Sequence, residues 1–411
     1  MRHVFILGIL VTTAVITACV GGKGTSATVP KPPTANTVTV TVDGGPAAAP
    51  NQINHAYVSV KVCTPGSQSQ CATIDHIRLD TGSRGLRLVG SVLTAHSVTL
   101  SSETDAQGQS IEECVTFSGG QTWGPVALAD VYMAGEIAGK VPVQILDDAG
   151  TGAPPPPSCG APGTQINDVS GFGANGILGI GVLVQDCGAA CVTNPAPAPL
   201  PAYYGCTVAG VCTPEGIALV NQVTNPVAMF ATDNNGVVIS LPHLVNTNGD
   251  ATMQGQLLFG IATQADNALS AVSLTVLGAD SNGDFRASYN GSPTALLARI
   301  DSGGEDYAFY DPTIPACASG LFIGYYCPTT PPQSVAVINN GVGTNNASAT
   351  VNFAIADPNS FVAGAAAIDG LAGGANAAKL FWGMPFFYGR KIYFGIDQRV
   401  SGPYTGPYYA Y

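Results

Sequence analysis

The sequence predicts an all-β protein made of two related halves. Among its 411 residues are 51 Gly and 30 Pro, a content that disfavours long helices and favours turn-rich β structure. Apolar runs that alternate with a period of two recur between turn signals such as Asn234-Asn235-Gly236 and Asn282-Gly283. A five-residue motif occurs twice, and each copy is followed by an apolar-apolar-Gly triplet. This repetition indicates an internal duplication.

Composition excludes several classes of function. The chain has 14 Lys and Arg against 26 Asp and Glu, a net charge of −12, and no basic run, so we expect no nucleic-acid partner. Disorder is also excluded, because 46% of the residues are hydrophobic. The sequence contains no Cys-x-x-Cys, and no His lies at metal-ligand spacing from a Cys. The glycine pattern at 171–176 precedes a short Gly-containing apolar run instead of a helix. We therefore expect neither a metal nor a cofactor.

The N-terminus predicts export. Arg2 precedes an apolar stretch over 4–16 that is too short to span a bilayer. Ile16-Thr17-Ala18-Cys19 then resembles the cleavage box of bacterial lipoproteins, which implies a signal peptide over 1–18 and a lipid on Cys19. Residues 19–36 are rich in Gly, Thr and Pro and predict a flexible tether. Because no Asp follows Cys19, the resemblance implies a lipid anchor in the cell envelope at the outer membrane. The alternative is an ordinary secretory signal.

The cysteines agree with an oxidising compartment. Of eleven, setting Cys19 aside leaves an even number, which favours disulfides. Short loops predict the pairs Cys63–Cys71 and Cys317–Cys327. Cys114 and Cys159 are left over from the local groups. The disulfide connectivity stays open within a group of four cysteines, Cys187, Cys191, Cys206 and Cys212.

Predicted elements divide the chain into two lobes, an N-terminal β lobe over 37–200 and a C-terminal β lobe over 201–411. A Cys- and Pro-rich segment, 187–214, has few strand signals and is predicted to bridge them. Short helices are predicted only at 216–223 and 360–371. The predicted strands are 37–42, 56–62, 74–79, 126–132, 141–145, 237–241, 256–259, 272–276, 295–300, 335–338 and 391–396.

The repeated motif carries the candidate chemistry. Arg78-Leu79-Asp80-Thr81-Gly82 recurs as Arg299-Ile300-Asp301-Ser302-Gly303, and each copy is followed by a triplet, Ile177-Leu178-Gly179 or Phe381-Trp382-Gly383. Each aspartate follows an apolar strand and precedes a hydroxyl residue and a turn-forming Gly. One such motif alone is an ordinary turn. If the two halves pack about a pseudo-twofold axis, however, Asp80 faces Asp301, and two carboxylates in contact share one proton.

These motifs resemble those of the pepsin-like aspartic proteases. The matching segments are Asp80-Thr81-Gly82-Ser83, Asp301-Ser302-Gly303-Gly304, and the runs at 175–181, 381–387 and 391–397. The resemblance implies a bilobal fold of two related β-barrel-like lobes about a pseudo-twofold axis, with Asp80 and Asp301 as the catalytic pair. It implies that the Thr81 and Ser302 hydroxyls grip the opposite loop, that Gly82 and Gly303 support the turns, and that Ser83 donates to Asp80.

The resemblance also implies a peptide or protein substrate in an interlobe cleft, a monomer, and a flap hairpin. The flap candidates are Phe117, Ser118, Gly119 and Gly120. The leading hypothesis is thus an envelope lipoprotein that acts as an aspartic endopeptidase-like hydrolase, with a water activated between Asp80 and Asp301.

Three features depart from the family pattern. Gly304 stands where the second loop usually carries Ser or Thr, and the flap region offers Phe117 but no Tyr, for which Trp123 and Tyr132 are the candidate substitutes. Arg84 and Arg87 stand where apolar residues are common in the family, and are expected to bias either the protonation of the Asp pair or the charge of the ligand. These departures support an alternative, a catalytically silent pepsin-like fold that binds peptide or glycan at the envelope. A third hypothesis is a structural lipoprotein without a functional cleft.

Overall fold

The described part of the protein begins just before the first predicted strand. The computed structural model describes residues 36–160, 165–193, 202–269, 274–289 and 295–411. The predicted signal peptide, Cys19 and the tether up to residue 35 lie outside the described residues, as does the predicted lobe boundary between residues 200 and 201.

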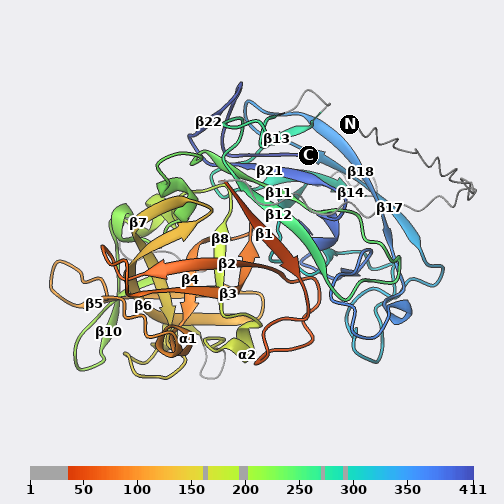
Figure 1. The fold of residues 1–411 in the computed structure, drawn as a ribbon. Helices are drawn as coiled ribbons and strands as arrows, with labels where there is room; N and C mark the ends of the chain where they lie inside the picture. Colours follow the sequence, from red (N-terminus) through yellow and green to blue (C-terminus); the bar gives the residue numbers. More distant parts are fainter. Residues whose placement is uncertain (1–35, 161–164, 194–201, 270–273, 290–294) are drawn as a thin grey trace, which may run out of the picture. The chain divides into compact units, whose positions relative to one another are not determined.

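Strands dominate the described residues, as the Gly and Pro content predicts (Figure 1). They are β1 (Thr37–Val42), β2 (Ala56–Cys63), β3 (Cys71–Asp80), β4 (Arg84–Val89), β5 (Ser110–Phe117), β6 (Gly120–Met133), β7 (Glu136–Leu146), β8 (Gly176–Ile180), β9 (Ala202–Cys206), β10 (Cys212–Glu215), β11 (Gly236–Ser240), β12 (Met253–Phe259), β13 (Val276–Gly278), β14 (Phe285–Tyr289), β15 (Leu296–Ile300), β16 (Tyr307–Phe309), β17 (Gln333–Asn340), β18 (Ser348–Ile355), β19 (Ala372–Gly373), β20 (Lys379–Trp382), β21 (Lys391–Gly395), β22 (Val400–Ser401), β23 (Tyr404–Thr405) and β24 (Tyr408–Ala410).

Helices are short. The α-helices are α1 (Gly90–Ala95) and α2 (Val169–Phe172), and the 3-10 turns are η1 (Pro157–Cys159), η2 (Gly188–Cys191), η3 (Leu219–Asn221), η4 (Pro226–Met229), η5 (Pro358–Ser360) and η6 (Met384–Phe386). The helix predicted over 216–223 is only the turn η3. The helix predicted over 360–371 is wrong, because Gly364 and Gly370 adopt φ angles of 80° and 74°, in the left-handed region that interrupts a helix.

A 15-stranded sheet runs through both halves of the chain. First-half strands β2 to β8 meet second-half strands through β1, whose register pairs Thr37 with Leu258 and Val42 with Met253 of β12. On the far side of β12 the sheet continues through β11, β21, β24 and β13. At its other end, β9 and β10 pair onto β5. The strands β9 and β10, just after the predicted lobe boundary, therefore extend the sheet at its first-half end.

A seven-stranded sheet belongs to the second half alone, in the order β18-β17-β14-β15-β20-β16-β19. It contains a threaded arrangement that the first half repeats. In the first half, β8 lies between β3, to which it is parallel, and β4, to which it is antiparallel. In the second half, β20 lies in the same way between β15 and β16. The predicted duplication is therefore present in the topology.

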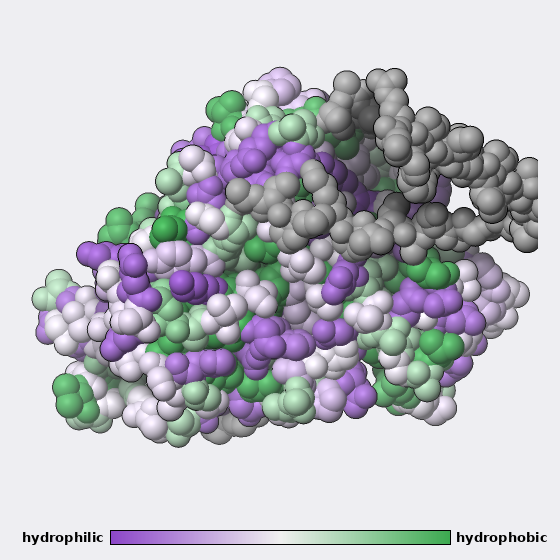
Figure 2. Space-filling view, in the orientation of Figure 1, coloured by the Kyte–Doolittle hydropathy of each residue, from purple (hydrophilic) through white to green (hydrophobic). Residues whose placement is uncertain are grey.

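Burial of apolar strand faces holds the halves together. One apolar cluster includes Val40 of the joining strand, Leu79 and Ile300 before the two aspartates, and Trp382 of the second triplet, all fully buried. On the face shown in Figure 2, hydrophilic and hydrophobic residues are interspersed in small areas. Within the described ranges no helix has the length and hydropathy needed to cross a membrane.

Candidate functional site

The two Asp loops lie at corresponding strand ends. Asp80 is the last residue of β3, and Asp301 directly follows β15. Within each loop the glycine two residues later donates its N–H to the aspartate: Gly82 N to Asp80 Oδ1 at 2.7 Å, and Gly303 N to Asp301 Oδ1 at 2.9 Å. These bonds orient both carboxylates in the same way, so the loops repeat in geometry as well as in sequence.

Reciprocal hydrogen bonds bring the two loops together. Thr81 Oγ1 donates to Ile300 O (3.0 Å) and accepts from Ser302 N (2.9 Å). Ser302 Oγ donates to Leu79 O (2.8 Å) and accepts from Thr81 N (3.1 Å). Both hydroxyl residues are 1% exposed. Each hydroxyl therefore satisfies two buried backbone groups of the opposite loop, one acceptor and one donor.

The glycines allow the carboxylates to meet. A Cβ on Gly82 would lie 2.3 Å from Asp301 Oδ2. A Cβ on Gly303 would lie 2.6 Å from Asp80 Oδ1 and 3.1 Å from Asp301 Oδ1. Each glycine thus packs against the aspartate of the opposite loop, and no side chain fits between them.

Burial and proximity perturb the titration of the pair. Burial, followed by the charge of Asp80 and a hydrogen bond to its carboxyl, raises the pKa of Asp301 to about 7. The positive charge of Arg299 and the Gly303 N–H oppose this rise. Asp80 accepts a hydrogen bond from Ser83 Oγ in addition to the Gly82 N–H. Near neutral pH Asp301 can therefore hold a proton while it lies in contact with the second carboxyl group.

The apolar-apolar-Gly triplets pair with the backbone of the two Asp loops. Gly179 of β8 pairs with Asp80, and Asp301 N donates to Trp382 O at 2.9 Å. A Cβ on Gly179 would lie 2.5 Å from Arg84 N, and one on Gly383 would lie 2.2 Å from Asp306 O. Glycine is required at both places because the backbone after each Asp loop passes directly over it.

Comparisons with known proteins agree with this geometry. Residues 32–411 match the family described as "Protein of unknown function (DUF3443)". The chain belongs to the DUF3443 family. Among solved structures, the crystal structure of the aspartic proteinase from Irpex lacteus is similar to this DUF3443 chain, with a TM-score of 0.50 and 15% sequence identity over 91% of this chain and 96% of that one. A search of curated proteins finds no match. The all-β, bilobal pepsin-like fold expected from the motifs is thus confirmed.

The predicted flap segment is the tip of a hairpin. Phe117 ends β5, Gly120 begins β6, and Ser118 and Gly119 form the turn between them. Phe117 packs edge-to-face on Phe172 at a centroid distance of 5.7 Å. The tip therefore carries an aromatic side chain that rests on the first-half lobe.

Neither candidate for a substitute flap Tyr lies at this tip. Trp123 cannot take the role, because it is 1% exposed, donates to Ala153 O and packs against Tyr204. Tyr132 lies near the other end of β6, where Lys61 Nζ is 5.0 Å from its ring centroid.

The two arginines after the first Asp loop differ. Arg87 is fully buried and pairs with Glu113 at 2.8 Å and Asp186 at 3.0 Å. Its charge is therefore paired with two carboxylates of the same lobe. Arg84 donates to Asn282 O at 2.9 Å, and burial together with Arg299 lowers its pKa to about 10.

Motif reasoning missed a set of charged residues around the loops. Arg78 donates to Gly303 O and Arg299 donates to Gly82 O. Glu305 lies beside Arg78 at 3.8 Å and binds His55 Nε2 at 2.9 Å. Burial lowers the pKa of His55 to about 4. The sequence feature that could have identified these charged residues is the Arg that stands two residues before the aspartate in both copies of the motif.

Five disulfides join the ten cysteines within the described ranges. Cys63–Cys71 and Cys317–Cys327 are the pairs predicted from short loops. The pairs left open are Cys114–Cys159, Cys187–Cys191 and Cys206–Cys212.

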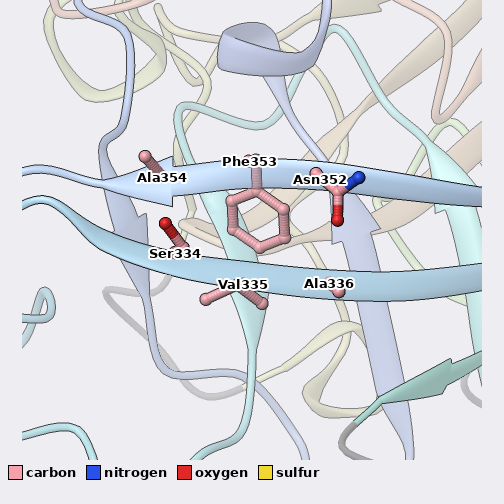
Figure 3. A pocket seen from close by; sticks show the side chains of 6 residues that line it. All are labelled: Ser334, Val335, Ala336, Asn352, Phe353 and Ala354. Carbon is pink, nitrogen blue, oxygen red and sulfur yellow. The ribbon is translucent and has the colours of Figure 1, made fainter.

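A separate hollow of about 550 Å³ lies on the β17–β18 hairpin (Figure 3). Side chains of Ser334, Val335, Ala336, Asn352, Phe353 and Ala354 line it. None of them is titratable and none belongs to an Asp loop, so the hollow lacks the chemistry of the candidate site. No group of three or more His, Cys, Asp or Glu side chains in the described ranges is arranged to hold a metal ion.

Proposed function

We propose that this DUF3443 protein is an aspartic endopeptidase-like hydrolase. The observation that carries the proposal is the meeting of Asp80 and Asp301 across the reciprocal Thr81–Ser302 bonds, with the pKa of Asp301 raised toward neutrality. A raised pKa of a buried carboxyl group in contact with a second carboxyl group is typical of sites that perform acid–base chemistry.

The two carboxyl groups divide the chemistry between them. Asp80, which accepts hydrogen bonds from Gly82 and Ser83, acts as the base and takes a proton from a water held between the carboxyls. Asp301, which burial and Asp80 keep protonated, donates its proton to the carbonyl oxygen of the scissile peptide bond while the water oxygen bonds to the carbonyl carbon. When the C–N bond then breaks, the proton held by Asp80 passes to the departing amine nitrogen, and the hydroxyl proton returns to Asp301 as the new carboxyl group forms. Two aspartates that share one proton are the established arrangement in aspartic proteases. An extended peptide or protein would bind in a cleft between the lobes, beneath the hairpin around Phe117.

We further propose that the protein works outside the cytoplasm, lipid-anchored through Cys19 at the outer membrane. Support comes from the cleavage-box resemblance at 16–19 and from the five disulfides, because disulfides persist in oxidising compartments. Labelling with a radioactive fatty acid would test the anchor, since Cys19→Ser should abolish incorporation and release the protein from the membrane fraction.

Substitution of each aspartate tests the proposed catalysis. Asp80→Asn and Asp301→Asn should each remove cleavage of a peptide library assayed from pH 3 to pH 8. Asp75→Asn is the matched control, because Asp75 lies on the same strand and its side chain is 69% exposed. Cleavage that survives in either dyad variant at the wild-type rate would refute the assignment.

A second candidate is a pepsin-like fold that binds peptide or glycan without cleaving it. The observation that favours it is Gly304, where no hydroxyl side chain is present to donate to Asp301 as Ser83 donates to Asp80. Calorimetric binding of peptides or glycans that remain intact after long incubation across the same pH range would support this candidate.

A further inference from the structure

Two arginines cross the junction between the Asp loops in opposite directions. Arg78 Nη2, from β3 of the first half, donates to Gly303 O at 2.6 Å. Arg299 Nη1, from β15 of the second half, donates to Gly82 O at 3.1 Å. Each arginine stands two residues before the aspartate of its own half, so the reciprocity follows the internal duplication.

The glycines that accept these bonds are the ones that contact the carboxylates. Gly82 packs against Asp301 and its N–H donates to Asp80, whereas Gly303 packs against Asp80 and its N–H donates to Asp301. An arginine that holds either glycine therefore acts on both carboxylates, on one by contact and on the other through a hydrogen bond.

Acidic side chains anchor the two arginines unequally. Asp284 Oδ1 accepts from Arg299 Nε at 3.0 Å and from Arg299 Nη2 at 2.8 Å. Glu305 lies 3.8 Å from Arg78 and is shared with His55 and Tyr325. Arg299 is thus held firmly by one carboxylate, while Arg78 relies mainly on its bond to Gly303.

We propose that Arg78 and Arg299 are positioning residues for the carboxyl pair, each bracing the glycine of the opposite Asp loop so that Asp80 and Asp301 stay in contact. They need not touch substrate. The inference rests on the proposed function for its importance to catalysis, but the bracing can be measured without it.

Titration of Asp301 reports the bracing directly. In Arg299→Met the positive charge and the bond to Gly82 are both lost, so the pKa of Asp301 should rise by about one unit. In Arg78→Met the support of Gly303 is lost, which weakens the Gly303 N–H bond to Asp301 and should also raise the pKa. Other titratable groups facing these side chains are Arg84 and Tyr409 beside Arg299, and Glu305 and His55 beside Arg78. None of them is substituted, although loss of either arginine also alters the charge that acts on its two neighbours.

The experiment is ¹³C NMR of protein labelled at the Asp carboxyl carbons, with the Asp301 signal assigned from Asp301→Asn. Arg299→Lys, which keeps a positive donor, should recover at least half of the shift. Arg286→Met is the matched control, because Arg286 pairs with Asp280 at 3.0 Å and its other hydrogen bond goes to Phe285 O, outside both Asp loops. An Asp301 titration in folded Arg299→Met and Arg78→Met equal to that of the wild type would overturn the proposal.

Asp284→Asn keeps the inference testable if the arginine variants do not fold. Asparagine keeps the side-chain oxygen that accepts from Arg299 Nε and Nη2, so Arg299 stays in place on Gly82 while its charge is less neutralised. The pKa of Asp301 should therefore fall, opposite in sign to the effect of Arg299→Met. An unchanged or raised pKa would count against the inference.

These titrations do not depend on peptide cleavage, so an inactive wild type would refute the proposed function and leave the bracing supported or refuted on its own data. If the wild type is active, the basic limb of its pH–rate profile should move upward in Arg299→Met.

Discussion

Replacing Thr81 with Val should loosen the junction between the Asp loops. Valine keeps the branched shape but removes the hydroxyl that donates to Ile300 O and accepts from Ser302 N, at 3.0 Å and 2.9 Å. Both backbone groups lie in a junction where Thr81 and Ser302 are 1% exposed, so they would be left without partners and without water. An unpaired buried polar group costs about 1–3 kcal/mol, and two of them give about 2–6 kcal/mol of unfolding free energy.

Equilibrium unfolding in urea, with the disulfides intact, measures this loss. Thr39→Val on β1 is the control, since Thr39 is exposed and its substitution should change the unfolding free energy by less than about 0.5 kcal/mol. A double-mutant cycle with Ser302→Ala should give a coupling energy of about 1 kcal/mol or more, because the two hydroxyls serve the same pair of loops. A Thr81→Val variant as stable as Thr39→Val, or strict additivity in the cycle, would refute the reciprocal junction.

Four further predictions concern the same region and its surroundings. Because the pKa of Asp301 is about 7 in the folded protein and ordinarily 3.8, the native state binds a proton that the unfolded chain releases. This contribution to stability is present below pH 4 and should be lost as the pH rises to 7, by up to about 4 kcal/mol, and urea unfolding at several pH values should show a smaller loss in Asp301→Asn. Gly82→Ala should displace Asp301 and destabilise the fold by about 1–3 kcal/mol, as measured in urea, and should abolish any peptide cleavage. Gly304→Ser, whose Cβ would have no contact closer than 3.4 Å, should supply a donor to Asp301 and lower its pKa in an NMR titration. Replacing Cys114 and Cys159 with Ser should cost about 2–4 kcal/mol, measured by urea unfolding against the wild type, because this bridge closes the longest of the disulfide loops, with a sequence separation of 45.

Local patterns predicted the elements whose signal lies within a few residues. The alternating run at 37–42 is β1, and the apolar runs before Asp80 and Asp301 are the ends of β3 and β15. Strands such as β16 and β20 were missed, because each has only three or four residues and is stabilised by neighbours distant in the chain. The helix expected over 360–371 failed because the backbone there pairs with distant groups, as in the Ile368 N–H bond to Asn54.

The residues of the candidate site could be predicted from the sequence because the motif that contains them occurs twice. The repeated motif predicted Asp80, Asp301 and the hydroxyls beside them, and a short separation predicted two disulfides. The ion pairs of Arg87 could not be predicted from the motif, because its partners Glu113 and Asp186 come from other parts of the chain.

Sequence by itself determined which chemical groups this protein repeats: an aspartate at the end of an apolar strand, a hydroxyl and a glycine after it, and an arginine before it. Only the tertiary structure decided that these groups meet across the two halves, with Arg78 on Gly303, Arg299 on Gly82 and a raised pKa at Asp301. The physical reason is that hydrogen-bond geometry and desolvation depend on distances between residues far apart in the chain, which folding brings together and which no local pattern encodes.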